Sequence, residues 1–239
     1  MIEKHLMKLR ARDDISAEEE QALRDALGEV RTIPADRTFI PAGKELTSST
    51  LLLEGVVCRY KDLSDGQRQI TELHVAGDFV DLHSFTLKHL DHNIMALTAS
   101  TVVQVPHENL KKITVDHPHL ARVMWFSTNL DAAIHREWEV SLGRRNALQR
   151  TAHLFCELQV RLGLVGLASE REYALPITQT ELAECLGLTS VHVNRVLKEL
   201  RERGLVEFRS RRVTIRDLAG LRREAEFDPA YLYLDKRSR

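Results

Sequence analysis

The sequence predicts an α+β protein in which an N-terminal antiparallel β-roll, a long helix and a C-terminal winged helix-turn-helix follow one another. Short β-like runs separated by turn residues occupy residues 31–106. Apolar residues then recur at near-heptad spacing over residues 118–141. Two short helical segments flank Gly187, and two strand-like runs follow them. The length of 239 residues agrees with two domains and a connector.

The N-terminal part begins with a helix and continues as strands. Residues 16–19 read Ser-Ala-Glu-Glu, a capping box that opens a short helix ending at Gly28. The β-like runs that follow are residues 38–40, 51–60, 69–75, 95–99 and 101–105. Asp65-Gly66 lies between two of them and is typical of a hairpin turn. The strand pattern lapses over residues 80–90, so we expect one short helix there and a small antiparallel roll overall.

The long helix carries a nearly regular apolar line. Its members are Leu120, Val123, Ser127, Leu130, Ile134 and Trp138. Their spacing is that of a coiled-coil seam, so we predict that they mediate dimerisation. Trp125 and Phe126 lie off this line, which gives the helix a second apolar side. A single intramolecular core helix is the alternative. We expect Gly143 to end the helix and Asn146 to cap the next one, residues 147–162, across a hinge.

The most specific pattern lies in the C-terminal part. Thr178 and Glu181 form a capping box before a helix of residues 179–186, Gly187 allows a left-handed turn, and Thr189 can cap a second helix. A helix-turn-helix needs a small residue inside the first helix, glycine at the turn and branched apolar residues inside the second. Ala183, Gly187, Val193 and Val196 meet these needs. We therefore predict a DNA-binding helix-turn-helix.

Several side chains are placed to contact DNA. The start of a recognition helix faces base edges and phosphates, and two strand-like runs, residues 205–208 and 213–215, enclose a basic tip that can act as a wing. Arg195 can read guanine, whereas Lys198 is placed for phosphate. The predicted DNA-binding residues are Thr189, Ser190, Val191, His192, Asn194, Arg195, Lys198, Arg209, Arg211 and Arg212.

Charge is distributed unevenly along the chain. The net charge is −1 overall, but residues 1–145 carry −4 and residues 146–239 carry +3. Residues 187–223 hold ten basic and four acidic side chains. Such asymmetry is expected of a surface that binds a polyanion, although a solvated helix with ion pairs four residues apart is the alternative.

The composition excludes several classes of protein. No run approaches 18 apolar residues, so we expect no membrane span. The N-terminus shows no secretory signal pattern. The three cysteines, Cys58, Cys156 and Cys185, form no close pair and indicate a reducing compartment. We therefore expect a cytoplasmic protein without a disulfide framework.

These motifs resemble the Crp/Fnr superfamily of bacterial transcription regulators. The resemblance spans residues 31–221 and is most specific over 177–189, Ile-Thr-Gln-Thr-Glu-Leu-Ala-Glu-Cys-Leu-Gly-Leu-Thr, and over 193–197, Val-Asn-Arg-Val-Leu. It implies a cyclic-nucleotide-binding-like jelly roll that senses a signal, and a homodimer on a palindromic operator. It also implies double-stranded DNA and RNA polymerase as partners. Arg195 matches the family's base-reading arginine, but Val191 replaces the glutamate common four residues earlier.

The resemblance and the composition together suggest four segments. Residues 1–116 form the N-terminal helix and β-roll, 117–145 the dimerisation helix and hinge, 146–221 the winged helix-turn-helix, and 222–239 a C-terminal tail.

The nature of the signal stays open. Members that bind cyclic AMP hold its phosphate with a short segment, the cassette, which begins here with residues 77–84, and with an arginine that follows it. Residues 69–110 of this chain contain no basic residue besides Lys88 and histidines. A phosphodiester needs such a cation, so we expect no cyclic AMP. An iron–sulfur cluster needs four thiolates, more than this chain has. Haem or a metal on histidines, from the set His74, His83, His89, His92, His117 and His119, is an alternative.

Three other functions are alternatives to a regulator that responds to a signal. A constitutive regulator without effector and a dimeric adaptor that no longer binds DNA are the alternatives within the family. An enzyme using Asp81, His83 and Ser84 lacks a nucleophile-elbow or metal signature. We therefore expect no catalytic residues and no enzyme activity.

Overall fold

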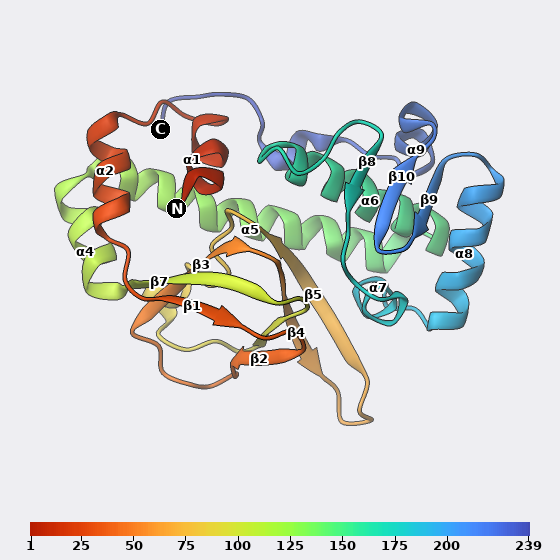
Figure 1. Cartoon of the computed structure of the whole chain (residues 1–239), viewed down its shortest axis with the longest axis horizontal. Helices are drawn as coiled ribbons and strands as arrows, with labels where there is room; N and C mark the ends of the chain where they lie inside the picture. The colour runs from red at the N-terminus through yellow and green to blue at the C-terminus, as the bar shows by residue number, and fades with distance from the viewer. The chain divides into compact units, whose positions relative to one another are not determined.

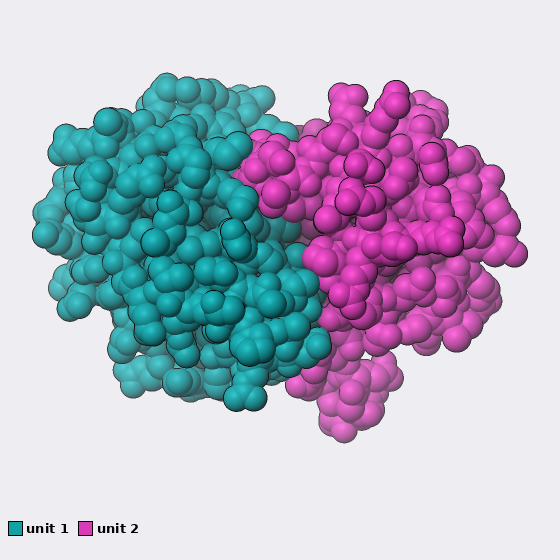
Figure 2. Space-filling view, viewed as in Figure 1, with its two compact units in different colours: residues 1–60, 73–132, 233–239 teal, residues 61–72, 133–232 magenta.

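The computed structural model describes all 239 residues, and they form two compact units (Figures 1 and 2). The first unit comprises residues 1–60, 73–132 and 233–239, and the second comprises 61–72 and 133–232. The boundary therefore falls inside the long helix, the tip of one hairpin belongs to the second unit, and the last seven residues belong to the first. No helix is long and apolar enough to cross a bilayer.

The first unit contains the expected roll, made of two antiparallel sheets. One has the order β1-β7-β3 and the other β2-β6-β4-β5. The strands are β1 (Val30–Ile33), β2 (Arg37–Ile40), β3 (Ser48–Glu54), β4 (Val56–Asp62), β5 (Arg68–Val75), β6 (Asn93–Ala96) and β7 (Ser100–Pro106). Inward-facing residues such as Leu52, Val57, Ile94 and Val102 fill the core between the sheets.

Gly55 divides the expected strand of residues 51–60 into β3 and β4. Its φ is +97°, and a Cβ there would lie 2.2 Å from Ser100 Oγ. Only glycine fits such a close, left-handed turn. The β4–β5 hairpin turns at Gly66, as the Asp65-Gly66 pair predicts, with Leu63 N donating to Gln67 O at 2.7 Å.

Helices cover the roll of the first unit. They are α1 (Glu3–Arg10), α2 (Ala17–Asp25), α3 (Ser84–Leu87) and α4 (His107–Asp116). The capping box of Ser16 and Glu19 is present as predicted. Helix α1 was not predicted, although Ile2, Leu6 and Leu9 recur at helical spacing and are buried. These side chains join the core cluster beneath α5.

Helix α5 (Pro118–Arg144) continues through Gly143, where the sequence predicts a break. Glycine weakens a helix by only about 1 kcal/mol, and the helix ends instead just before the Asn146 cap of α6 (Ala147–Gly163). Asn146 and Gln149 form a reciprocal capping box. The predicted junction therefore lies where expected, but Asn146 rather than glycine determines it.

The second unit contains a winged helix. Its elements are β8 (Glu172–Ala174), α7 (Gln179–Leu186), α8 (Ser190–Glu202), β9 (Val206–Arg209), β10 (Arg212–Ile215), α9 (Leu218–Glu224) and a 3-10 turn η1 (Pro229–Leu232). The sheet order is β8-β10-β9. Strand β8 and helix α9 were not predicted; β8 is only three residues long and pairs through β10. Figure 1 shows α7 and α8 beside this sheet.

Candidate nucleic-acid interface and sensor site

The helix-turn-helix has its caps and its turn at the residues that the sequence predicts. Thr178 Oγ1 accepts from Glu181 N at 3.1 Å, and Thr189 Oγ1 accepts from His192 N at 3.2 Å, so each helix starts at a side-chain cap. Gly187 adopts φ +59° at the turn. Val193 and Val196 of α8 are buried, as their spacing predicts. Because one face of α8 is fixed in the core, its opposite face is fixed in solvent.

The predicted DNA-binding residues lie at the surface of the second unit. Nine of the ten are exposed and Ser190 is half-buried. Val191, the one large apolar side chain among the ten, is 66% exposed. Arg195, Lys198 and Arg201 line a polar groove of about 380 Å³ between α8 and β9. A groove with this excess of cations suits a polyanion.

The turn of the wing has a strained backbone. Ser210 and Arg211 both have positive φ, +52° and +58°, so the β9–β10 hairpin turns without a glycine. This conformation costs non-glycine residues free energy. It holds the turn of Arg209, Ser210, Arg211 and Arg212 in one tight loop at the end of the strands.

Part of the local positive charge is already neutralised within the chain. Arg203 pairs with Glu199 and with Glu224, and Arg216 pairs with Glu207 at 3.4 Å. Arg212, predicted to contact DNA, lies 3.2 Å from Glu172 Oε1, with both side chains about half exposed. Exposed pairs are weak, so Arg212 can still exchange this partner for phosphate.

The predicted dimer line lies on the inner side of α5. Leu120, Val123, Ile134 and Trp138 are buried against their own chain, at 1, 3, 4 and 7% exposure. Ser127 and Leu130 are half-buried beside a small cavity. Trp138 Nε1 donates to Glu157 of α6 at 3.2 Å. In this conformation the line therefore serves intramolecular packing.

The opposite side of α5 is the exposed one. At 100° per residue, Arg122, Trp125, Asn129, Ala132 and Arg136 share this side, and all five are exposed. The large apolar side chain among them, Trp125, is 70% exposed. The spacing of this second line is also 3, 4, 3 and 4, but three of its five members are polar, so the sequence shows no apolar repeat there.

The cassette of the first unit is closed by helix α1. Lys8 Nζ pairs with Asp78 Oδ1, while Asp78 Oδ2 accepts from Val75 N at 2.9 Å. His5 Nδ1 donates to Gly77 O at 3.0 Å. A Cβ on Gly77 would lie 2.8 Å from the Lys4 backbone, so α1 approaches as closely as glycine permits. Burial lowers the pKa of His5 to about 4, which keeps the ring neutral.

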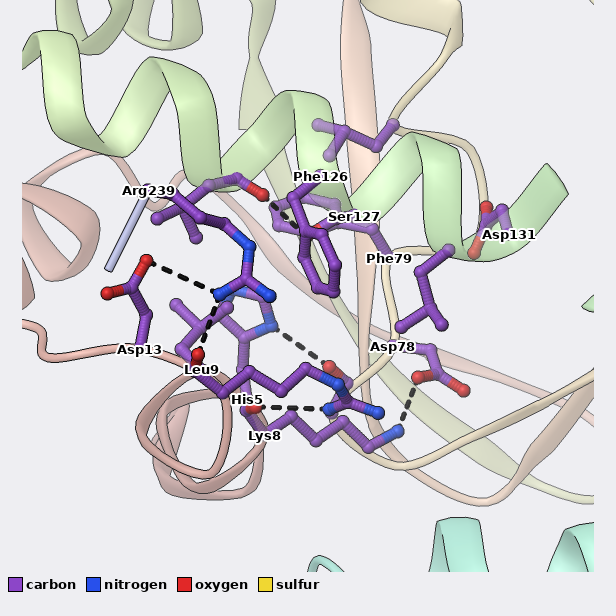
Figure 3. A pocket seen from close by; sticks show the side chains of 15 residues that line it. His5, Lys8, Leu9, Asp13, Asp78, Phe79, Phe126, Ser127, Asp131 and Arg239 are labelled. Atoms are coloured by element: carbon purple, nitrogen blue, oxygen red, sulfur yellow. Dashed lines mark hydrogen bonds and ion pairs between the residues drawn. The ribbon is translucent and has the colours of Figure 1, made fainter. Parts of the chain in front are cut away.

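Little empty space remains between the cassette and α5. The cavity lined by His5, Lys8, Asp78, Phe126 and Asp131 has a volume of about 60 Å³ (Figure 3). That volume holds about two water molecules. Pockets for small ligands are typically 300–1,000 Å³, so this one has no room for a nucleotide.

Sequence reasoning missed one basic residue inside the roll. Arg59, 2% exposed, comes from β4 and donates to Val80 O at 2.8 Å. Another nitrogen of the same guanidinium, Nη2, lies 2.9 Å from Asp131 Oδ2 of α5. Asp81 is buried nearby, and desolvation raises its pKa to about 7 in spite of the Arg59 charge. The family's phosphate-binding arginine is expected after the cassette, whereas Arg59 reaches the cassette from a strand before it.

The cysteines and histidines are dispersed. Cys58, Cys156 and Cys185 are buried in β4, α6 and α7. No group of three or more His, Cys, Asp or Glu side chains is arranged to hold a metal ion. His83 and His92 approach to 5.5 Å between ring centroids, and His119 lies between Glu19 and Asp13. Neither arrangement has a set of ligands around one point.

Two families of known domains match the chain. Residues 30–117 match the cyclic nucleotide-binding domain, and residues 149–224 match the Crp-like helix-turn-helix domain. The fumarate and nitrate reduction regulatory protein of Escherichia coli K12 is 28% identical over 185 residues, which cover 77% of this chain and 74% of that protein.

Solved structures show the same architecture. FixK2 from Bradyrhizobium japonicum is 26% identical, with a TM-score of 0.74 over 82% of this chain and 96% of that one. A CooA variant from Carboxydothermus hydrogenoformans is 18% identical, with a TM-score of 0.66 over 85% and 89% of the two chains. The second likeness concerns the fold alone.

Proposed function

Because the chain belongs to the Crp/Fnr superfamily of DNA-binding transcription regulators, we propose that it binds a palindromic operator as a homodimer. The observation that carries the proposal is the exposed polar face of α8, with Arg195 at its centre and its other face fixed in the core. Two such faces related by a two-fold axis would read two half-sites in successive major grooves.

Base recognition rests on the first two turns of α8. Arg195 can donate two hydrogen bonds to a guanine, and Asn194 and His192 can contact neighbouring base edges. Val191 offers only apolar contact, which suits a thymine methyl. The operator should therefore differ from that of family members with glutamate at this position. Thr189, Ser190, Lys198 and the wing arginines 209, 211 and 212 would hold the backbone phosphates.

Dimerisation uses the outer side of α5 in this proposal. The helix is long enough, at 27 residues, to support a coiled-coil-like contact. The exposed Trp125 lies on that side together with the small residue Ala132 and the polar Asn129. The buried line from Leu120 to Trp138 then supports the contact from within, since it packs α5 on its own chain.

The sensor half is proposed to work without cyclic AMP or an iron–sulfur cluster. Chain groups already neutralise one another where a phosphate would bind: Lys8 with Asp78, and Arg59 with Asp131. Helix α1 fills the space above the cassette. Three buried cysteines are too few for a cluster. A constitutive regulator fits these observations best; haem on histidines is the alternative and would be visible in the absorption spectrum.

Catalysis forms no part of the proposal. Ser84, the one candidate nucleophile, is fully buried, and its hydroxyl shares His107 with Ser49 at 3.2 Å. A buried serine without an oxyanion site cannot accept a substrate. The protein would act by binding DNA and, as family members are expected to, by contacting RNA polymerase.

A binding-site selection followed by gel shifts tests the proposal. Purified protein should enrich a two-fold symmetric sequence from a random DNA pool and should bind it with affinity that falls steeply with salt. An adaptor that binds only proteins would enrich no sequence and give no retarded band. Transcription in vitro from a promoter carrying the selected site would then test the contact with RNA polymerase.

A further inference from the structure

The last seven residues of the chain bind to the first unit. Just before them, Tyr231 donates its hydroxyl to Glu157 Oε2 of α6 at 2.9 Å, and Leu232 is fully buried in the second unit. Residues 233–239, in contrast, belong to the first unit. The segment is thus anchored at one end in the second unit and at the other end in the first.

The side chain of Arg239 occupies a shaped site in the first unit (Figure 3). Its guanidinium carbon lies 3.6 Å from the ring centroid of Phe126 on α5. One nitrogen, Nη1, donates to Arg12 O at 2.6 Å and lies 3.4 Å from Asp13 Oδ2. Only 17% of the side chain is exposed. An aromatic face, a carbonyl and a carboxylate around one planar cation are what guanidinium recognition requires.

The site is organised by residues other than the tail. Asp13 is 2% exposed, and its Oδ1 accepts from Asp14 N at 2.8 Å. Its Oδ2 lies 3.2 Å from His119 Nε2, and His119 Nδ1 lies 2.6 Å from Glu19. The carboxylate is therefore held in place by α5 and by the turn after α1. A buried carboxylate in a fixed position favours one cation strongly.

Neighbouring residues of the tail fix its direction. Arg237 N donates to Arg12 O at 2.9 Å, and Lys236 pairs with Asp14 at 2.5 Å. Tyr233 meets the edge of Phe126 at 6.1 Å between ring centroids. The side chain of Arg237, in contrast, is 77% exposed and reaches only Asp235 of the tail itself, at 3.5 Å. The site thus distinguishes two arginines that are two positions apart.

We propose that Asp13, Phe126 and the Arg12 carbonyl form a guanidinium-binding site whose ligand is Arg239 of the same chain. The tail then connects the turn after α1 to helix α5 within the first unit, through the side chain of Arg239. Because the ligand is covalently attached, its effective concentration is high and a modest contact suffices to keep the site filled.

Hydrogen–deuterium exchange of the protein, residues 1–239, tests this assignment. Arg239→Ala should raise exchange in peptides covering residues 233–239 and 9–14 by about tenfold, since a desolvated cation–π contact and its hydrogen bonds are lost. Arg237→Ala removes the same charge from the same tail and should match the wild type. Phe126→Leu, which keeps an apolar side chain but removes the aromatic face, should release the tail as Arg239→Ala does.

Equal exchange in Arg239→Ala and Arg237→Ala would overturn the proposal, as would fast exchange of residues 233–239 in the wild type. Exchange in β3 and β7 should stay unchanged in every variant, which shows that the roll remains folded. The measurement needs no DNA, so its outcome is independent of the proposed operator binding.

Discussion

Arg59 and Asp131 join β4 to α5 through a 2.9 Å ion pair inside the first unit. The arginine side chain is 3% exposed and the aspartate 25%. The pair places the Asp131 carboxylate beside Arg59, the arginine that reaches the cassette from the roll. It therefore links the position of the long helix to the inside of the roll.

Removing the negative partner of this pair should destabilise the protein. Asp131→Asn leaves the buried Arg59 cation without a counter-charge, and we expect a loss of about 1–3 kcal/mol in the free energy of unfolding. The exposed Asp116→Asn is the control and should cost almost nothing. Denaturant titration followed by circular dichroism measures both. Equal midpoints for the two variants would contradict a stabilising role for the pair.

Specific DNA binding should depend on Arg195. Arg195→Ala should weaken binding to the selected operator by about 1–3 kcal/mol and relax the preference at one base pair of each half-site. Lys198→Ala, one turn further along α8, should weaken binding to all DNA sequences alike. It should also reduce the slope of log affinity against log salt concentration by about one. Gel shifts at two salt concentrations separate the two effects. A selected consensus that survives Arg195→Ala intact would exclude this residue as a base reader.

Dimerisation should depend on the outer side of α5. Trp125→Glu places a charge at the centre of the proposed contact and should give monomers in sedimentation velocity. Val115→Glu changes a residue of α4 that is as exposed, at 68%, and should leave the dimer intact. Ile134→Asp, on the buried line, should lower the melting temperature instead. Monomers from Val115→Glu, or a dimer from Trp125→Glu, would place the contact elsewhere.

Stability should depend on pH through His5. Burial lowers its folded-state pKa to about 4, below the ordinary 6.5. Between these values the unfolded chain binds a proton that the folded chain does not, so His5 removes stability as the pH falls from 6.5 to 4, by up to about 3 kcal/mol. Asp81 acts oppositely, because its raised pKa of about 7 favours the folded state as the pH falls below 7.

A difference measurement isolates the contribution of His5. His5→Asn keeps a donor for Gly77 O but no longer titrates, so its melting temperature should fall less between pH 7 and pH 5 than that of the wild type. The exposed His89→Asn is the control and should follow the wild type. Parallel curves for wild type and His5→Asn would show that His5 is already accessible to protons in the folded protein.

The winged helix was predictable because its signals are local. Thr178 with Glu181, Gly187 and Thr189 fix the ends of α7 and α8, and the capped helices appear at the expected residues. The roll was predictable in outline, since turn residues separate its strands. Helix α1 was missed because no side chain caps its start, and only its contact with Gly77 and the cassette makes its position meaningful.

The long helix shows what an apolar pattern leaves undecided. The line from Leu120 to Trp138 is predicted to mediate dimerisation, and in the single chain most of it is buried, but such a line suits a neighbouring subunit as well as the chain's own core. Spacing carries no information about which partner covers it. The polar and small residues of the outer side are visible as a surface only once the inner side is packed.

The sequence by itself determined the helix-turn-helix, the face of α8 that carries Arg195, and a number of cysteines too small for a four-thiolate cluster. These depend on residue types and on spacings within a few turns of the chain. Only the tertiary structure decided that Arg59 meets Asp131, that α1 fills the cassette and that Arg239 lies on Phe126. Each of these contacts joins residues more than 70 positions apart, so that folding, rather than local pattern, brings them together.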